Sequence, residues 1–273
     1  MLCFYNDEFE SNYGNRNKYI SKYKTYSCVK YLNNMFKDVS DSSDLKYIDT
    51  RNVILMINTF KNLKECINLS YWNTSKIISM KLCFSYCYEL KSLKGIETWD
   101  VSKVKSLERT FEYNHIKNYK ELSSWKLDSL LILSHTFEHN SELNNFEGIS
   151  DMNVSEVKDF TCTFAYCNSL KTLDGLEKWK VDKNSCFKLM FLNCKSLEDC
   201  SAIDNWNLTK NYQDMFKNCD NIKRYPIWFK KDAKIHMDDF EEIHIKEEDE
   251  YDKYLIKRYQ ERVAMNMKIL SEF

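Results

Sequence analysis

The stretch TFAYCNSL at residues 163–170 matches the stretch TFEHNSEL at residues 136–143, with cysteine where the earlier copy has asparagine. Both belong to one pattern that recurs at intervals of 24 to 27 residues. The phenylalanine of this pattern stands at Phe36, Phe60, Phe84, Phe111, Phe137, Phe164, Phe191 and Phe216. Self-similarity at such a period is the signature of a repeat architecture. The sequence therefore predicts eight repeat units over residues 24–222.

Each unit carries apolar residues at fixed distances before its phenylalanine. Val104, Leu107 and Phe111 show the spacing of a short amphipathic helix. Ser102 stands just before them, as an N-cap residue would. We therefore expect a short helix in each unit, ending in this one near residue 113. A residue twelve positions before the phenylalanine is large and apolar in five units, namely Trp72, Trp99, Trp125, Met152 and Trp179.

The segment after each phenylalanine predicts a strand and a turn. In Leu90-x-x-Leu93-x-x-Ile96 the first half has the character of a short strand. Three of the four glycines, Gly95, Gly148 and Gly175, lie four residues before the tryptophan or methionine, which indicates a turn with positive φ. One such unit cannot bury its own apolar face, but stacked units bury a continuous core. We expect an α/β repeat solenoid, a leucine-rich-repeat-like stack of eight strand–turn–short-helix units with ladders of Phe, Trp and aliphatic side chains.

The two ends of the chain are predicted to cap this stack. Aromatic residues in 1–23 favour an N-terminal cap. Residues 223–273 favour a C-terminal cap with a terminal helix, whose stripe runs from Tyr251 to Leu270. The acidic run at 247–252 leaves open that this helix binds a partner instead.

The charge and hydropathy patterns exclude two classes of partner. The net charge is −1 and the sequence has no dense basic cluster, so we expect no nucleic-acid binding. No apolar run approaches the roughly 18 residues of a membrane span. The start, MLCFYNDEFE, lacks the apolar segment of a signal peptide, so a cytoplasmic location is predicted.

The cysteines fall mostly on the repeat and therefore have a structural explanation. The position three residues after the phenylalanine holds Cys87, Asn114, Asn140, Cys167, Cys194 and Cys219. A compact side chain that faces inward suits all of them. Disulfides between successive units, such as Cys167 with Cys194, and metal binding are the alternatives. We predict no catalytic, cofactor or metal site, and hence no cofactor.

One short motif suggests zinc chemistry. His135, Glu138 and His139 form H-x-x-E-H, an inverted zinc-protease signature that could place two imidazoles on one helical face. Phe137 at its centre, however, is a core position of the repeat. The position of His139 holds tyrosine in other units, for example Tyr86 and Tyr166. We interpret both histidines as parts of the repeat.

The repeat resembles BspA-like leucine-rich repeats, in the branch described as a mycoplasma lipoprotein-associated repeat. The segments WDVSKVKSLERTFEYN (99–114) and NVSEVKDFTCTFAYCNSLKTLDGL (153–176) carry the resemblance, which covers residues 24–222. It implies a solenoid scaffold, and members are mostly surface or secreted proteins assigned to adhesion.

We therefore predict a non-enzymatic leucine-rich-repeat scaffold that mediates protein–protein interaction with an unidentified protein partner. The exposed lysines that flank the predicted strands are candidates for this contact: Lys91, Lys94, Lys171 and Lys195. Two alternatives remain open at this point. One is a surface adhesin exported by a route without a recognisable signal, and the other is a zinc metallopeptidase at His135, Glu138 and His139.

Overall fold

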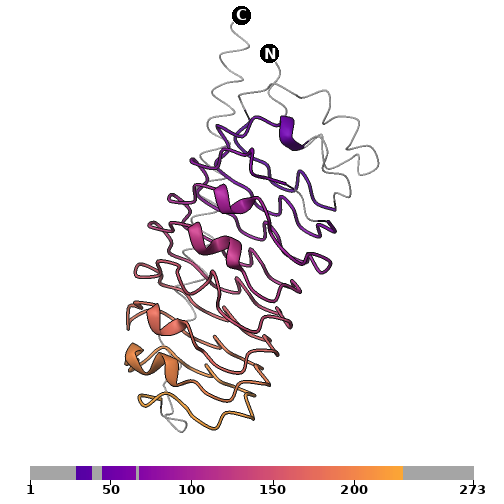
Figure 1. The fold of residues 1–273 in the computed structure, drawn as a ribbon. Coiled ribbons are helices and arrows are strands. Elements are labelled where there is room, and N and C mark those ends of the chain that lie inside the picture. Colours follow the sequence, from indigo (N-terminus) through magenta and orange to yellow (C-terminus); the bar gives the residue numbers. More distant parts are fainter. Residues whose placement is uncertain (1–28, 39–44, 66–67, 230–273) are drawn as a thin grey trace, which may run out of the picture. The chain divides into compact units, whose positions relative to one another are not determined.

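A computed structural model describes residues 29–38, 45–65 and 68–229. Within these ranges the helical elements are short 3-10 helices and none is an α-helix. They are η2 (Leu45–Tyr47), η3 (Ile96–Thr98), η4 (Lys120–Ser124), η5 (Leu176–Lys178) and η6 (Ser201–Trp206). Figure 1 shows η3 to η6 following one another along one side of the stacked units. The predicted N-terminal cap at 1–23 lies outside the described residues, and so does the predicted C-terminal cap at 223–273 from residue 230 on.

Successive units pair in parallel at a single residue each. One column of bridges joins, in order, Tyr31, Leu55, Ser79, Ser106, Ile132, Asp159 and Cys186. A second column joins Thr172, Asp199 and Arg224. The first two lie inside segments predicted as strands, whereas Arg224 lies in the segment predicted as the C-terminal cap. The described parts of these segments form isolated bridges and no extended strands. The strand prediction is therefore wrong in extent, although the parallel register of the units is present.

The predicted short helix is also wrong. Arg109 and Tyr113, on either side of Phe111, adopt the left-handed conformation with φ of 52° and 57°. Left-handed residues break an α-helix, because its hydrogen bonds need continuous right-handed backbone. The Phe111 N–H donates instead to the Thr136 carbonyl of the next unit at 3.0 Å, and the Tyr113 N–H donates to Glu138 at 2.8 Å. The same conformation recurs two residues before and two after each of the eight phenylalanines.

The physical reason is competition for the same backbone donors. A helix would use each N–H four residues back within one unit. The stack uses every second N–H to bind the neighbouring unit, as in Leu133 to Asp159, His135 to Thr161 and Phe137 to Thr163 at 2.8 to 2.9 Å. Spacings of three and four residues bring apolar side chains inward in both arrangements, so the pattern alone could not separate them.

The predicted N-caps have a different role. The Asp100 carboxylate accepts hydrogen bonds from the backbone N–H of Ser102 at 3.1 Å and from its hydroxyl at 2.7 Å. Asn153 and Ser155 form the same pair. These are turns closed by an aspartate or asparagine side chain, which places the serine in a turn and not at the start of a helix.

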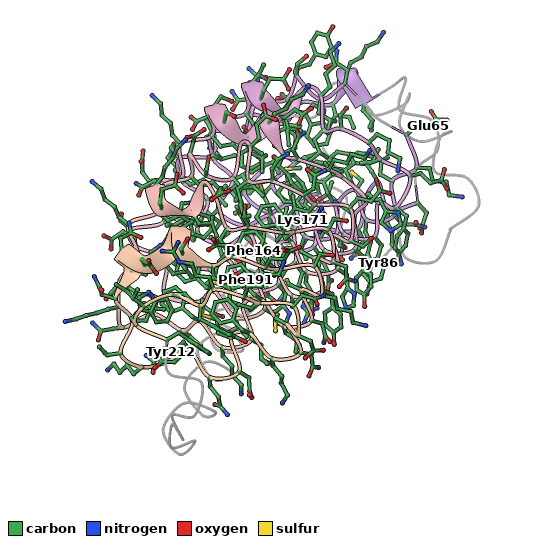
Figure 2. All side chains as sticks on the ribbon, turned by 60° about the horizontal axis from the view of Figure 1, so that its bottom comes forward. Glu65, Tyr86, Phe164, Lys171, Phe191 and Tyr212 are labelled. Atoms are coloured by element: carbon green, nitrogen blue, oxygen red, sulfur yellow. The ribbon has the colours of Figure 1, made fainter. Side chains whose placement is uncertain are left out.

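Two aromatic ladders fill the core. All eight phenylalanines of the repeat stack in order, with ring centroids of neighbours 5.2 to 5.9 Å apart. Figure 2 labels two neighbours of this Phe ladder, Phe164 and Phe191. Trp72, Trp99 and Trp125 stack at 6.4 and 6.5 Å. The Phe and Trp ladders predicted from the repeat are therefore present.

Polar atoms of the core also bond from unit to unit. The Trp99 indole N–H donates to the Leu69 carbonyl of the preceding unit at 3.0 Å. Buried threonines one residue before the phenylalanine do the same, such as Thr136 to Leu107 at 2.9 Å and Thr163 to Leu133 at 3.1 Å. Each of these carbonyls also accepts a backbone N–H of its own unit, as Leu107 does from Thr110 at 2.9 Å, so the bond from the next unit is a second one. The hydrogen bonds between units and the ring stacking therefore favour the same register.

The glycine prediction is confirmed. Gly95, Gly148 and Gly175 have φ of 107°, 81° and 107°. At Gly148 a Cβ atom would lie 1.9 Å from the Tyr119 carbonyl oxygen of the preceding unit. Glycine is required there for backbone conformation and for close approach.

Candidate functional site

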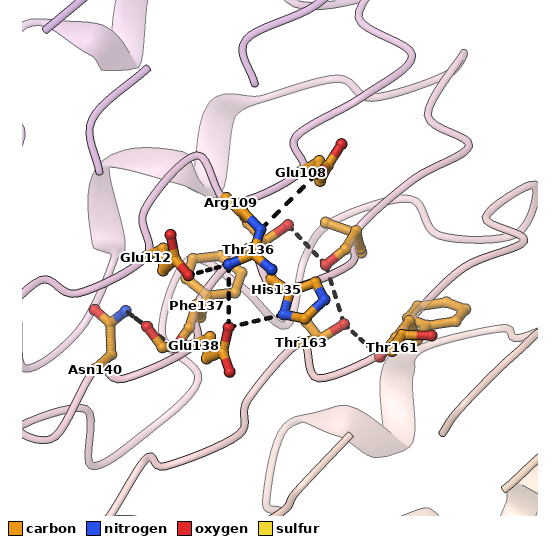
Figure 3. A network of polar contacts seen from close by, with 12 residues as sticks. Glu108, Arg109, Glu112, His135, Thr136, Phe137, Glu138, Asn140, Thr161 and Thr163 are labelled. Atoms are coloured by element: carbon orange, nitrogen blue, oxygen red, sulfur yellow. Dashed lines mark hydrogen bonds and ion pairs between the residues drawn. The ribbon is translucent and has the colours of Figure 1, made fainter. Parts of the chain in front are cut away.

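A cluster of ionisable side chains from two adjacent units is the most concentrated polar chemistry that we find in the described residues. Figure 3 shows its members Glu108, Arg109, Glu112, His135 and Glu138, called here the charged cluster. Arg109 pairs with Glu112, and its guanidinium lies 3.6 Å from Glu138 and 3.9 Å from Glu108. His135 Nδ1 lies 2.7 Å from Glu138 Oε2.

The repeat explains why these side chains meet. Arg109 and His135 each stand two residues before the phenylalanine of their unit, and Glu112 and Glu138 each stand one residue after it. Units in register place equivalent positions next to one another, and the left-handed backbone at Arg109 and His135 (φ of 52° and 56°) turns both in the same way. The cluster therefore arises because stacking brings equivalent positions together and because two adjacent units carry ionisable residues at these positions.

The two central carboxylates differ in their electrostatics. Burial raises the pKa of Glu112 above its usual value. Burial also acts to raise the pKa of Glu138, but the hydrogen bond with His135 and the positive charges of His135 and Arg109 outweigh it, and the pKa of Glu138 is lowered. Of the two carboxyl groups, Glu138 is therefore the one that is anionic near neutral pH.

His139 does not join His135 and Glu138. Its ring stacks between Tyr113 and Tyr166, with centroids 4.1 Å from each. Tyr86 continues the row, 4.7 Å from Tyr113. These four residues, Tyr86, Tyr113, His139 and Tyr166, are called here the aromatic strip. Burial between the neighbouring rings lowers the pKa of His139, so its imidazole is mainly neutral at pH 7. The interpretation of His139 as one more aromatic ring of the repeat is confirmed.

The geometry also removes the basis of the H-x-x-E-H alternative. That signature needs a helix to present both histidines on one face, whereas His135 and His139 have left-handed φ of 56° and 59°. A different third residue lies near His135 and Glu138, namely Cys162. The potential ligand atoms of these three side chains all lie within 4.8 Å of one another.

Sequence reasoning missed Cys162 as a neighbour of His135. The signal was available, because Cys162 stands two residues before Phe164, just as His135 stands two residues before Phe137. The cysteine is 5% exposed. Burial is the main cause that raises the pKa of the Cys162 thiol to about 12, and the charge of Glu138 adds to it. The free thiol is therefore protonated at neutral pH.

The cysteines three residues after the phenylalanine have a shared structural role. The Cys167 thiol contacts the Phe137 carbonyl of the preceding unit with Sγ at 3.2 Å, and Cys194 contacts Phe164 at 3.1 Å. Asn140 donates from Nδ2 to the Phe111 carbonyl at 2.7 Å. Cysteine and asparagine thus bind the equivalent carbonyl, that of the phenylalanine in the preceding unit. The eight cysteines among the described residues are free thiols.

The lysines proposed as contact residues are exposed, as expected: Lys91, Lys94, Lys171 and Lys195. Large exposed hydrophobic side chains in the described part of the chain include Tyr71 (67% exposed) and Tyr88 (39%). Tyr88 lies edge-on against Tyr86 and Tyr113, at 6.0 and 6.3 Å, and so extends the aromatic strip toward solvent.

Comparison with known families gives one clear match. The family described as "Mycoplasma protein of unknown function, DUF285" matches residues 7–87, 55–145 and 113–228. The chain belongs to this family. The three matches overlap, as expected when several copies of one repeat fit the same family pattern. Membership in DUF285 assigns no activity.

Other comparisons add little. No curated protein matches the chain at a significant level. A leucine-rich repeat protein from Bacteroides ovatus ATCC 8483, known from a crystal structure, is similar at 12% sequence identity. The similarity covers 63% of this chain and 64% of that protein, with a TM-score of 0.24, which is too low to support an argument. In the described part of the chain no helix is long and apolar enough to cross a membrane.

Proposed function

We propose that this chain is a non-enzymatic, BspA-like leucine-rich-repeat solenoid that binds another protein through the aromatic strip. The observation that carries the proposal is the strip itself, because half-buried rings from four consecutive units line up beside the exposed Tyr88. Stacked repeats characteristically bind partners through extended surfaces of this kind. Tyrosine is enriched in protein–protein interfaces and among the residues that dominate their binding energy.

The orientation of the rings favours a protein over other ligands. Neighbouring rings in the strip are nearly parallel, with interplanar angles of 7° to 17° and centroid distances of 4.1 to 4.7 Å. Both faces of each inner ring are therefore covered by the rings next to it. Lys61 covers Tyr86 from outside, with Nζ 4.6 Å from the ring centroid. Stacking of nucleic-acid bases requires open ring faces. Ring edges and phenol hydroxyls suit hydrogen bonds to a polypeptide.

The tyrosine hydroxyls are available as donors. Burial raises the pKa of Tyr86 and of Tyr113 above the usual value, with a further contribution from nearby carboxylates such as Glu112. Both phenols are therefore protonated at neutral pH and can donate to backbone carbonyls of a partner. The charged cluster beside the strip would add charge specificity at the rim of such an interface.

The test is affinity capture with matched variants. Wild type, Tyr88→Ala, Tyr166→Ala and the control Tyr71→Ala would each be used as immobilised bait, and captured proteins quantified by mass spectrometry. We expect one protein that wild type and Tyr71→Ala retain equally and that the two strip variants lose at least tenfold, since central tyrosines cost about 2 kcal/mol or more when truncated. Calorimetry with the purified partner would follow.

The control is demanding because Tyr71 is more exposed than Tyr88, at 67% against 39%. Equal capture by all four baits would contradict the proposal, as would a loss with Tyr71→Ala alone. Circular dichroism of each variant would confirm that differences in capture do not arise from unfolding.

A further inference from the structure

We propose that His135, Glu138 and Cys162 form a binding site for a zinc-like divalent metal ion. His135 and Glu138 come from one unit and Cys162 from the next, and their potential ligand atoms lie within 4.8 Å of one another. This set differs from the H-x-x-E-H motif, because a cysteine of the neighbouring unit takes the place of His139. The inference does not depend on the protein-binding role proposed above.

The donor set selects the class of metal. Imidazole nitrogen, thiolate sulfur and carboxylate oxygen are the three kinds of ligand that bind Zn²⁺, with bonds of about 2.0 to 2.3 Å. Hard cations such as Ca²⁺ and Mg²⁺ prefer oxygen ligands only. Tetrahedral zinc holds its ligand atoms roughly 3.3 to 3.8 Å apart at those bond lengths. The ligand atoms now lie at most 4.8 Å apart, so the longest separation would have to shorten by about 1 Å, while the 2.7 Å contact between His135 Nδ1 and Glu138 Oε2 would have to open by a similar amount. Both are movements of the size that side-chain rotation gives.

The electrostatics around the site favour a cation. Three carboxyl groups, Glu108, Glu112 and Glu138, stand against two basic side chains, Arg109 and Lys81, in the ion pairs of this cluster, so the surroundings of the site are rich in carboxylate oxygens. Arg109 is the nearest competitor for Glu138, at 3.6 Å. It would keep its contacts with Glu112 and Glu108 if a metal ion displaced it from Glu138. The displacement therefore leaves no unpaired charge.

The site is also accessible to a small ion. The side chains of His135 and Glu138 are 23% and 13% exposed, whereas Cys162 is 5% exposed. An ion would approach past the histidine and the carboxylate and meet the thiol at the inner end. Three protein ligands leave the fourth position of a tetrahedral ion to water or to a ligand of a partner.

The experiment is titration of the full, reduced chain with Zn²⁺ by calorimetry and with Co²⁺ by absorption spectroscopy. Wild type should bind one equivalent of either ion, and the Co²⁺ complex should show a thiolate-to-metal charge-transfer band. Cys162→Ser should abolish this band and weaken Zn²⁺ binding at least tenfold. His135→Asn and Glu138→Gln should each weaken binding at least tenfold, and they decide the question if Cys162→Ser does not fold.

Two control variants make the result specific. Cys167→Ser removes a buried thiol of the cysteine ladder, and His139→Tyr restores the ring found at the equivalent position of other units. Both should bind Zn²⁺ as wild type does. The proposal is overturned if wild type does not bind, if Cys162→Ser binds unchanged with its cobalt band intact, or if His139→Tyr loses binding as Cys162→Ser does.

Discussion

Phe164 offers the most direct test of the Phe ladder. Its ring is fully buried and stacks on Phe137 and Phe191 at 5.5 and 5.7 Å. It also meets Phe146 edge-on at 5.1 Å and Trp179 at 6.0 Å. Substitution by alanine would remove all four ring contacts and leave a cavity between the rings of the two adjacent units.

The magnitude follows from two contributions. Loss of the buried ring surface costs about 2 kcal/mol, the transfer free energy of a large apolar side chain. A residual cavity on the order of 80 Å³ at about 24 cal/mol per Å³ adds about 2 kcal/mol. Phe164→Ala should therefore lower the free energy of unfolding by about 4 kcal/mol. Phe164→Leu fills most of the space and should cost about half as much.

The assay is urea-induced unfolding, followed in parallel by circular dichroism and tryptophan fluorescence. Stacked repeats can unfold in several steps, so agreement between the two probes decides whether one free energy describes the transition. Tyr71→Ala is the control and should stay within about 0.5 kcal/mol of wild type, because Tyr71 is 67% exposed. A change below about 1 kcal/mol in Phe164→Ala would refute the register of the ladder.

Three further predictions follow from individual contacts. Cys167→Ser keeps a donor for the buried carbonyl at 3.2 Å and should be about 1 kcal/mol more stable than Cys167→Ala in urea unfolding, whereas equal stability would show that the contact is inert. Gly148→Ala should lower the melting temperature far more than Gly175→Ala, because the new Cβ would lie 1.9 Å from a backbone oxygen in the first case and 3.2 Å from a side-chain carbon in the second; similar losses would contradict the close approach. Hydrogen bonds from a serine hydroxyl and N–H lower the pKa of Asp100, so its contribution to stability is present above about pH 4 and is lost as the pH falls. Asp100→Asn should keep the turn and make the free energy of unfolding depend less on pH below pH 4. If the loss of stability in acid is the same as in wild type, Asp100 does not contribute to it.

The sequence predicted the packing positions better than the backbone. The Phe ladder, the Trp ladder and the positive φ of Gly95 were all inferred from recurrence alone, and they are present in the structure. Recurrence identifies which residues share an environment, because equivalent positions of stacked units must meet equivalent neighbours. It does not identify the hydrogen-bond partner of each backbone group.

The expected helix from Val104 to about residue 113 shows this limit. Its apolar spacing fits a helix, and Tyr113 is not a residue that favours positive φ. The left-handed conformation of Tyr113 is stabilised by its hydrogen bond to Glu138 in the next unit. Since that partner lies 25 residues away in sequence, no local propensity could reveal it.

By itself, the sequence determined the number of units, their register and the inward-facing rings, because these follow from a period that eight copies repeat. Only the tertiary structure decided that every second N–H bonds to the next unit, which replaces the helix by turns. It also decided which variable side chains meet across units. His135 and Cys162 are 27 residues apart in sequence, and stacking of the units brings their side chains together. His139 instead stacks between the tyrosines of the aromatic strip. The physical reason is that chemistry between units depends on pairs of positions, whereas a repeat pattern specifies each position separately.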